Sequence, residues 1–171
     1  MTDYLESRLP ARLLQWIPQL RMLQSCFGLD PLLMAAICDR ESKGGLALDP
    51  VGAGGVGDGG HGKGLFQIDD RSHQTFTAAR FDDLSPFWAQ PTMNAAYAGR
   101  LFSVNLTHCG GDTLTAIAAY NCGLSKAVKT ARGVHVYQDK IDALDAVTTN
   151  NYVSGVLSIY KSFQPTQGVL Q

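Results

Sequence analysis

Three carboxyl groups, those of Glu41, Asp58 and Asp69, have positions that suit acid–base chemistry. Glu41 ends an apolar helical segment. Apolar surroundings and the negative end of a helix dipole both disfavour a charged carboxylate, so both raise its pKa. A carboxyl group that stays protonated near neutral pH can protonate a leaving oxygen, as the general acid of a glycosidase does. The alternative is that Glu41 is a surface residue at a frayed helix end, paired with Arg40 or Lys43.

The two aspartates belong to a glycine-rich segment. Ten glycines lie between residues 44 and 64, a density that no helix tolerates. Residues 65–69 then alternate as a short strand, with Leu65, Gln67 and Asp69 on one side and Phe66 and Ile68 on the other. We interpret this segment as an irregular β-hairpin. It would bring Asp58 and Asp69 to one wall of a cleft, with Gln67 beside Asp69 and Glu41 on the opposite wall.

The rest of the chain has helical periodicity and helix-boundary signals. Asp30-Pro31 is an N-cap followed by proline at the first helical position, and Asp112 is a second N-cap. Gly28 and Gly123 end helices, and Gly133 ends a short one. We expect helices over residues 10–27, 32–41, 91–105, 113–121, 125–132 and 151–163. The fold class is therefore α+β: one domain, residues 1–171, mostly helical with a small glycine-rich β-hairpin.

Several patterns in the glycine-rich segment match nucleotide or metal motifs but lack their context. Gly57, Gly59 and Gly62 satisfy GxGxxG, but no strand precedes them and no helix follows. Residues 57–63 spell GxxxxGK, yet Gly64 stands where a phosphate loop needs serine or threonine. The aspartates of this region lack the spacing of an EF-hand, and the four histidines form no ligand pair. We expect no metal and no cofactor.

Composition excludes other classes of function. A net charge of −1 gives no basic face for nucleic acid. No apolar run approaches the roughly 18 residues of a membrane span. The N-terminus lacks a basic head followed by an apolar stretch, so we expect no secretory signal. The four cysteines match no zinc pattern. Cys38 lies in an apolar run and is expected as a buried thiol, while the disulfide state of Cys26, Cys109 and Cys122 stays open.

The motifs resemble those of a known superfamily. Goose-type lysozymes have sequence runs that resemble four runs of this chain: Asp39–Ser42, Gly57-Asp58, Gly64–Asp69 and Arg71–His73. The interval between Asp58 and Asp69 is also similar to that of the family. Ala119–Gly123 resembles the AYNxG motif shared with soluble lytic transglycosylases. The segment Asn150–Val153, with Tyr160 downstream, looks more like the transglycosylase version of the last helix. Cys122 stands where alanine or serine is more common. The first cysteine-bonded segment of the animal enzymes is not recognisable, so residues 1–28 are expected to be only a helical lid or brace.

The resemblance implies a lysozyme-like fold and an enzyme that cleaves peptidoglycan glycan strands. It implies that Glu41 is the general acid and that Asp58 and Asp69 position or activate water. It also implies sugar-contacting or groove roles for a further set of residues: Gln67, His73, Tyr120, Asn121 and Tyr152. A proteinaceous lysozyme inhibitor or immunity protein is a candidate partner. Such an enzyme acts in the periplasm or on the cell wall, reached by phage lysis, by a secretion system or as a trimmed secreted protein.

Two enzymatic outcomes and one non-enzymatic alternative remain. Lytic transglycosylases have no partner carboxylate and let the sugar's own 6-hydroxyl close a 1,6-anhydro ring. Because both aspartates are present, we favour a muramidase that uses water, with inversion if acid and base stand roughly 6.5–9.5 Å apart. A non-catalytic peptidoglycan-binding module would keep Tyr120 and Asn121 but would not need Glu41.

Overall fold

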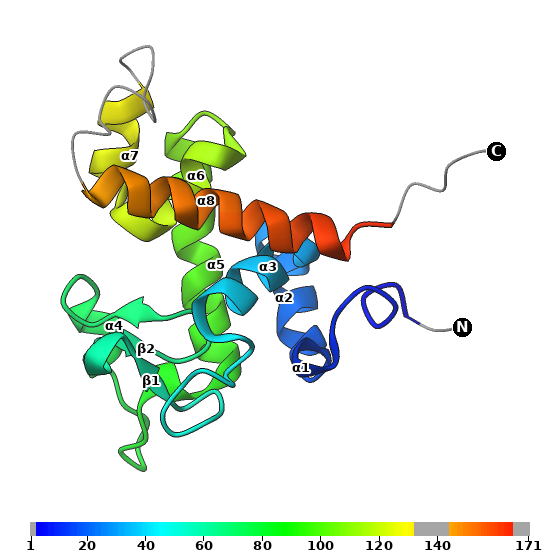
Figure 1. Ribbon diagram of the computed structural model, residues 1–171. Coiled ribbons are helices and arrows are strands. Elements are labelled where there is room, and N and C mark those ends of the chain that lie inside the picture. Colours follow the sequence, from blue (N-terminus) through cyan, green and yellow to red (C-terminus); the bar gives the residue numbers. More distant parts are fainter. Residues whose placement is uncertain (1–2, 132–143, 166–171) are drawn as a thin grey trace.

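The computed structural model describes residues 3–131 and 144–165. Figure 1 shows a mostly helical molecule with a small β region on one side and the long last helix lying across the others. The α-helices are α1 (Ala11–Leu14), α2 (Ile17–Phe27), α3 (Pro31–Ser42), α4 (Gln74–Ala78), α5 (Pro91–His108), α6 (Thr113–Cys122), α7 (Leu124–Ala131) and α8 (Leu144–Phe163). The expected α+β class, dominated by helices, is confirmed.

The predicted helix boundaries follow from their caps. The Asp30 carboxylate accepts hydrogen bonds from the backbone N–H groups of Leu32 and Leu33, and Asp112 does the same for the start of α6. Gly28 ends α2 in the left-handed conformation, with φ 66°. The last helix begins earlier than the predicted residue 151. The predicted end of α7, Gly133, lies outside the described residues.

The first predicted helix is broken into two, which corrects the sequence-based expectation. Helix α1 ends at Leu14, and α2 begins at Ile17 with Pro18 in its first turn. A proline inside a helix removes one backbone hydrogen bond, and its ring clashes with the carbonyl four residues earlier, here that of Leu14. The helix therefore stops at Leu14 and restarts at Ile17, while Leu13 and Leu20 both remain in the core.

The glycine-rich segment forms a sheet rather than a single hairpin. Strands β1 (Val56–Gly57), β2 (Gly62–Lys63) and β3 (Ile68–Asp69) pair antiparallel in that order, with Gly57 opposite Gly62 and Gly62 opposite Asp69. A short 3₁₀ turn over Asp58–Gly60 joins the first two strands. A second one covers Phe87–Ala89, before α5.

The predicted strand over residues 65–69 is wrong in its first half. Gly64 and Gln67 have positive φ angles of 69° and 47°, and the Gln67 N–H donates to the Gly64 carbonyl, so the chain turns before β3. Leu65 is consequently fully buried together with Phe66, whereas Gln67 is only partly buried. Asn94 of α5 fixes this turn from outside: its side chain accepts from the Phe66 N–H at 2.9 Å and donates to the Lys63 carbonyl at 2.9 Å.

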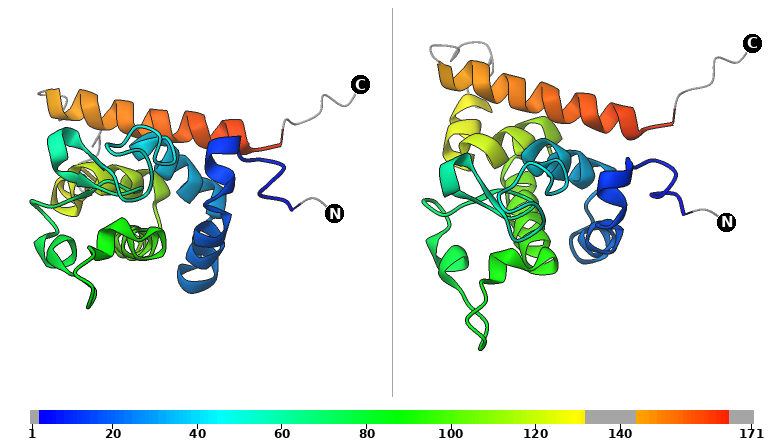
Figure 2. Two further views of the ribbon diagram at one scale, coloured as in Figure 1. Left: turned by 90° about the horizontal axis from the view of Figure 1, so that it is seen from below. Right: turned by 60° about the horizontal axis from the view of Figure 1, so that its bottom comes forward.

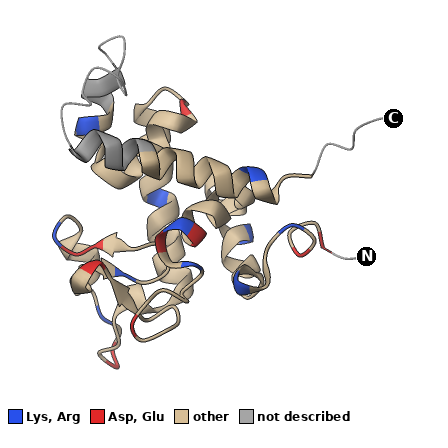
Figure 3. Cartoon of the chain, in the orientation of Figure 1, with Lys and Arg blue, Asp and Glu red and all other residues tan. Residues whose placement is uncertain are grey.

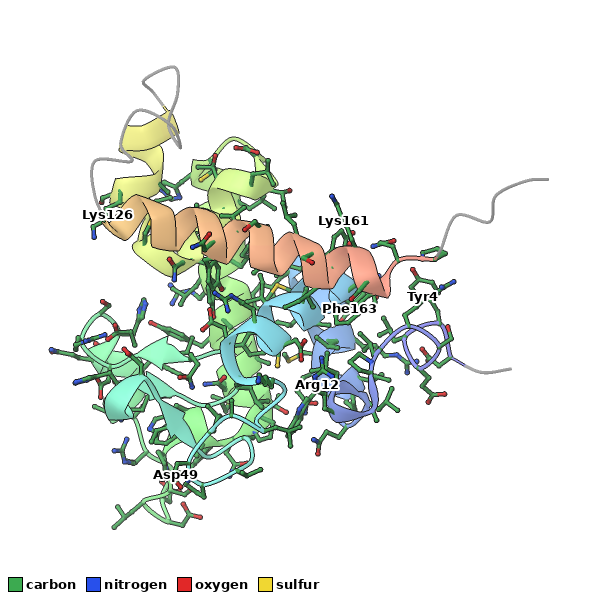
Figure 4. The ribbon with its side chains drawn as sticks, viewed as in Figure 1. Tyr4, Arg12, Asp49, Lys126, Lys161 and Phe163 are labelled. Atoms are coloured by element: carbon green, nitrogen blue, oxygen red, sulfur yellow. The ribbon has the colours of Figure 1, made fainter. Side chains whose placement is uncertain are left out.

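Helix α3 lies at the centre of the core, with every residue from Pro31 to Asp39 buried. Helix α8 lies along it, and both views in Figure 2 show α8 spanning the molecule over the other helices. The buried Asp39 accepts two hydrogen bonds from the Arg12 guanidinium, at 2.6 and 2.8 Å. Arg12, labelled in Figure 4, lies where α1 meets α3. Trp16 also donates to the Gly44 carbonyl at 2.9 Å. The N-terminal segment therefore contacts the C-terminal end of α3 through Arg12 and the residues just after α3 through Trp16.

The cysteines are all free thiols, and Cys38 is buried as expected. Cys109 and Cys122, whose pairing the sequence left open, do not form a disulfide. Among the described residues, no helix is long and apolar enough to cross a lipid bilayer.

Candidate active site

A cleft of about 470 Å³ lies between the end of α3, the sheet and the end of α6. Most of the predicted site residues line it together: Glu41, Asp58, Gln67, Asp69, His73, Tyr120 and Asn121. Gly62, Ile68, Arg71 and Leu101 complete the lining. Figure 3 shows that both signs of charge occur in this β region, at the lower left of the view. The cleft is therefore mixed in charge, because Asp58, Asp69 and Arg71 all line it.

Glu41 lies in the last turn of α3 with its carboxyl group in a mostly buried setting. Burial raises its pKa from 4.5 to about 7, and the hydrogen bond from the Tyr152 hydroxyl and the charge of Arg40 oppose that rise. Neither Arg40 nor Lys43 forms an ion pair with Glu41 in the described part of the chain. The guanidinium of Arg40 lies instead over the Tyr152 ring, 5.7 Å from its centre. Glu41 is therefore largely protonated below pH 7 and about half protonated at pH 7.

Tyr152 supports Glu41 from behind. Its side chain is only 5% exposed, it comes from α8, and its hydroxyl donates to Glu41 Oε1. It is not among the residues that line the cleft. Through this hydrogen bond Tyr152 positions the Glu41 carboxyl group and opposes the rise of its pKa. The sugar-contacting role that the resemblance implied for Tyr152 stays a prediction.

Asp58 and Asp69 share one cation, Arg71. The Arg71 guanidinium donates to Asp69 at 2.7 and 3.0 Å, and its Nη2 also donates to Asp58 Oδ2 at 3.0 Å. The backbone N–H of Arg71 adds a further bond to Asp69 at 2.7 Å. These hydrogen bonds lower the pKa of Asp69 to about 2. Asp69 is therefore ionised at neutral pH, and a partner that the sequence did not point to holds Asp58.

Gln67 lies over the middle of the sheet. Its side-chain amide donates to the Gly64 carbonyl at 2.8 Å. A Cβ atom added at Gly57 or Gly62 would come within 2.2 or 2.1 Å of Gln67 Oε1, so both glycines leave the space that this side chain occupies. The glycine content that resembled a nucleotide motif thus has a packing cause at these two positions.

Tyr120 and His73 line the cleft with defined partners. The Tyr120 hydroxyl donates to the Phe66 carbonyl at 2.9 Å, and burial raises its pKa well above 10, so it stays protonated. Nδ1 of His73 lies 3.2 Å from the Tyr97 hydroxyl. Burial lowers the pKa of His73, although the charge of Asp69 opposes this, and the ring is therefore neutral at neutral pH. Both side chains present polar atoms fixed by the fold.

Sequence reasoning missed Arg71, Tyr97 and Asn94. Arg71 lies two residues after Asp69, a spacing at which its backbone N–H can bond the carboxylate, and this local signal was available. Asn94 and Tyr97 come from α5, and no local pattern links them to the site. In the described residues, no group of three or more histidine, cysteine, aspartate or glutamate side chains could hold a metal ion.

In this cleft a helix-borne glutamate with a raised pKa faces a small antiparallel sheet that carries two aspartates. In the comparison with protein families, the model of the transglycosylase SLT domain matches residues 20–142. The chain belongs to this family, and with it to the lysozyme-like enzymes that act on peptidoglycan. A search of curated proteins gave no match. The family match supports the superfamily that the motifs indicated, whereas the goose-type assignment and the extent of one domain over residues 1–171 stay predictions.

Proposed function

We propose that the protein is a muramidase that hydrolyses the β-1,4 bond between N-acetylmuramic acid and N-acetylglucosamine, with inversion at the anomeric carbon. The observation that carries the proposal is one cleft that holds a protonated carboxyl group, Glu41, together with two carboxylates tied to Arg71. This combination supplies an acid for the leaving group and acceptors for a water proton in the same space.

In the proposed reaction Glu41 donates its proton to the glycosidic oxygen as the bond to the anomeric carbon breaks. A water held by Asp58 and Asp69 attacks that carbon from the opposite face and passes a proton to the aspartate pair. Gln67, His73, Tyr120 and Asn121 contact the sugars along the cleft. Inversion requires room for the water, roughly 6.5–9.5 Å between the acid and the base.

The second candidate is a lytic transglycosylase, and two observations favour it. The matched family is described by that activity. A carboxylate with a pKa of about 2 is also a weak base, because the efficiency of general base catalysis falls as the pKa of the base moves below the working pH. In this case the sugar's 6-hydroxyl would attack the anomeric carbon, and the ionised Glu41 would accept its proton.

The non-catalytic alternative fits the site less well. When a buried carboxyl group with a raised pKa loses its proton at higher pH, the free energy of unfolding falls. A module that only binds glycan would gain nothing from this loss of stability. We therefore propose a bacteriolytic role at the cell wall or in the periplasm. A proteinaceous lysozyme inhibitor or immunity protein that covers the cleft remains a proposed partner.

Product analysis tests the proposal. Purified peptidoglycan digested by the protein is separated and its muropeptides are weighed by mass spectrometry. Hydrolysis gives reducing N-acetylmuramic acid ends, and proton NMR of the first products shows the α anomer if the reaction inverts. Mostly 1,6-anhydro ends would assign the protein to the transglycosylases instead, and β anomers would exclude inversion.

A further inference from the structure

Arg71 is the one cation that contacts both cleft aspartates in the described part of the chain. We propose that Arg71 is a positioning residue that holds Asp58 and Asp69 as one water-binding pair, and that it thereby sets the share of cleavages that end in hydrolysis rather than in anhydro-ring closure. This inference rests on the proposed function, because it concerns the step that follows protonation by Glu41.

Asp69 is fixed on Arg71 by several bonds at once. Nε of Arg71 donates to both carboxylate oxygens, at 3.0 and 3.2 Å, and Nη2 donates to Oδ2 at 2.7 Å. The backbone N–H of Arg71 bonds the same carboxylate. A guanidinium that grips a carboxylate at several points leaves little freedom of orientation. Asp69 therefore has a set position before substrate binds.

Asp58 is held far less firmly. Its side chain is 67% exposed, its φ is 48°, and its neighbours are Gly57, Gly59 and Gly60. Among the described residues, Arg71 is the one partner of its carboxylate. The structure places it on Arg71, so that this one bond determines whether Asp58 lies beside Asp69.

The geometry also limits how far apart the two carboxylates can lie. Oδ2 of Asp58 and Oδ2 of Asp69 both bond the same Nη2 atom, so they can be no farther apart than the sum of those two distances, 3.0 and 2.7 Å. The positive charge of Arg71 offsets the repulsion between two acidic side chains at this separation. With Arg71 between them, both carboxylates can accept hydrogen bonds from one water.

Only one of the two possible outcomes uses this pair. In hydrolysis, the oxygen of water bonds the anomeric carbon and one water proton passes to an aspartate. In ring closure, the 6-hydroxyl oxygen bonds that carbon and its proton passes to the Glu41 carboxylate. Loss of Arg71 should therefore slow the first outcome and leave the second, which a loss of fold or of substrate binding would not do.

The test compares Arg71→Gln, Arg71→Lys and a charge-matched control, Arg100→Gln, which removes an exposed arginine on α5. Each digests the same peptidoglycan, and the ratio of reducing to anhydro ends is measured by mass spectrometry. We expect the ratio to fall about tenfold or more in Arg71→Gln, since one positioned base contributes at least ~10²-fold to catalysis. Arg71→Lys keeps the positive charge but lacks the planar guanidinium group that donates to several oxygens at once, and it should give an intermediate ratio. Arg100→Gln should match the wild type.

A second experiment distinguishes an effect on the aspartate pair from misfolding. In a background that carries Asp58→Asn and Asp69→Asn, adding Arg71→Gln should not change the ratio further, because the pair through which it acts is absent. An unchanged ratio in Arg71→Gln, with reducing ends still dominant, would overturn the inference and leave the proposed function standing. Predominantly anhydro ends in the wild type would overturn the hydrolase proposal and the inference with it, and no cleavage at all would overturn the enzyme assignment.

Discussion

The replacement of Glu41 by glutamine should stabilise the protein at alkaline pH while it removes the acid. The pKa of Glu41 rises from 4.5 to about 7 because its carboxyl group is buried. Between these values the folded state binds more protons than the unfolded state, so the free energy of unfolding falls as the pH rises through this window. Glutamine does not titrate and escapes this loss. Its carbonyl oxygen can still accept the hydrogen bond from Tyr152.

The magnitude follows from the size of the shift. At about 1.4 kcal/mol per pKa unit, a rise from 4.5 to about 7 corresponds to at most roughly 3.5 kcal/mol. Because Glu41 lines a cleft open to solvent, screening reduces this to roughly 1–2 kcal/mol. We expect Glu41→Gln to unfold with about the same free energy as the wild type near pH 4 and with roughly 1–2 kcal/mol more near pH 8.5.

Urea unfolding monitored by circular dichroism at a series of pH values measures this difference. Subtracting the free energy of unfolding of the wild type from that of the variant at each pH removes the contribution of all other titrating groups, because the two proteins share them. Glu6, the chain's one other glutamate, is exposed, and Glu6→Gln serves as the matched control. A difference between Glu41→Gln and the wild type that stays flat from pH 4 to pH 8.5, or that favours the wild type at high pH, would refute the claim that burial keeps Glu41 protonated.

Three further predictions concern activity. In the wild type the rate should fall as the pH rises through about 7, because Glu41 loses its proton. The Tyr152→Phe variant lacks a hydrogen bond that lowers the pKa of Glu41. In this variant the fall in rate should therefore occur at a higher pH. A fall at an unchanged pH would show that Tyr152 does not act on the acid. Asp58→Asn or Asp69→Asn should each leave partial hydrolysis, and the double variant should lose ~10²–10⁴-fold; substantial hydrolysis by the double variant would mean that neither aspartate is the base. Activity should survive excess EDTA, and a chelator-sensitive activity that added metal restores would contradict the metal-free mechanism.

Local signals predicted the helices that position the site. Asp30 and Asp112 cap α3 and α6 through their own neighbours, so these boundaries could be inferred from a few adjacent residues. The position of Glu41 at a helix end followed directly. The break before Pro18 was also a local signal, but the leucine periodicity on both sides of it outweighed the proline in the sequence-based prediction.

The parts that sequence could not supply depend on distant contacts. The turn before β3 is held by Asn94, which is contributed by α5, so residues 65–67 do not form the predicted strand. The hydrogen bond between Tyr152 and Glu41 requires α8 to lie along α3. Arg71 reaches Asp58 only because the sheet folds back on itself. Each case pairs residues from separate elements, which periodicity within one segment does not reveal.

The role of Glu41 as the acid that cleaves the glycan strand is the step on which the proposed reaction depends. Its most direct test is the release of soluble muropeptides from purified peptidoglycan by the wild type and by Glu41→Gln, with circular dichroism to verify that the variant is folded. We expect the wild type to release fragments and the variant to lose at least ~10²–10⁴-fold of the rate, because glutamine cannot donate the proton. A folded variant whose rate stays within about tenfold of the wild type would contradict it.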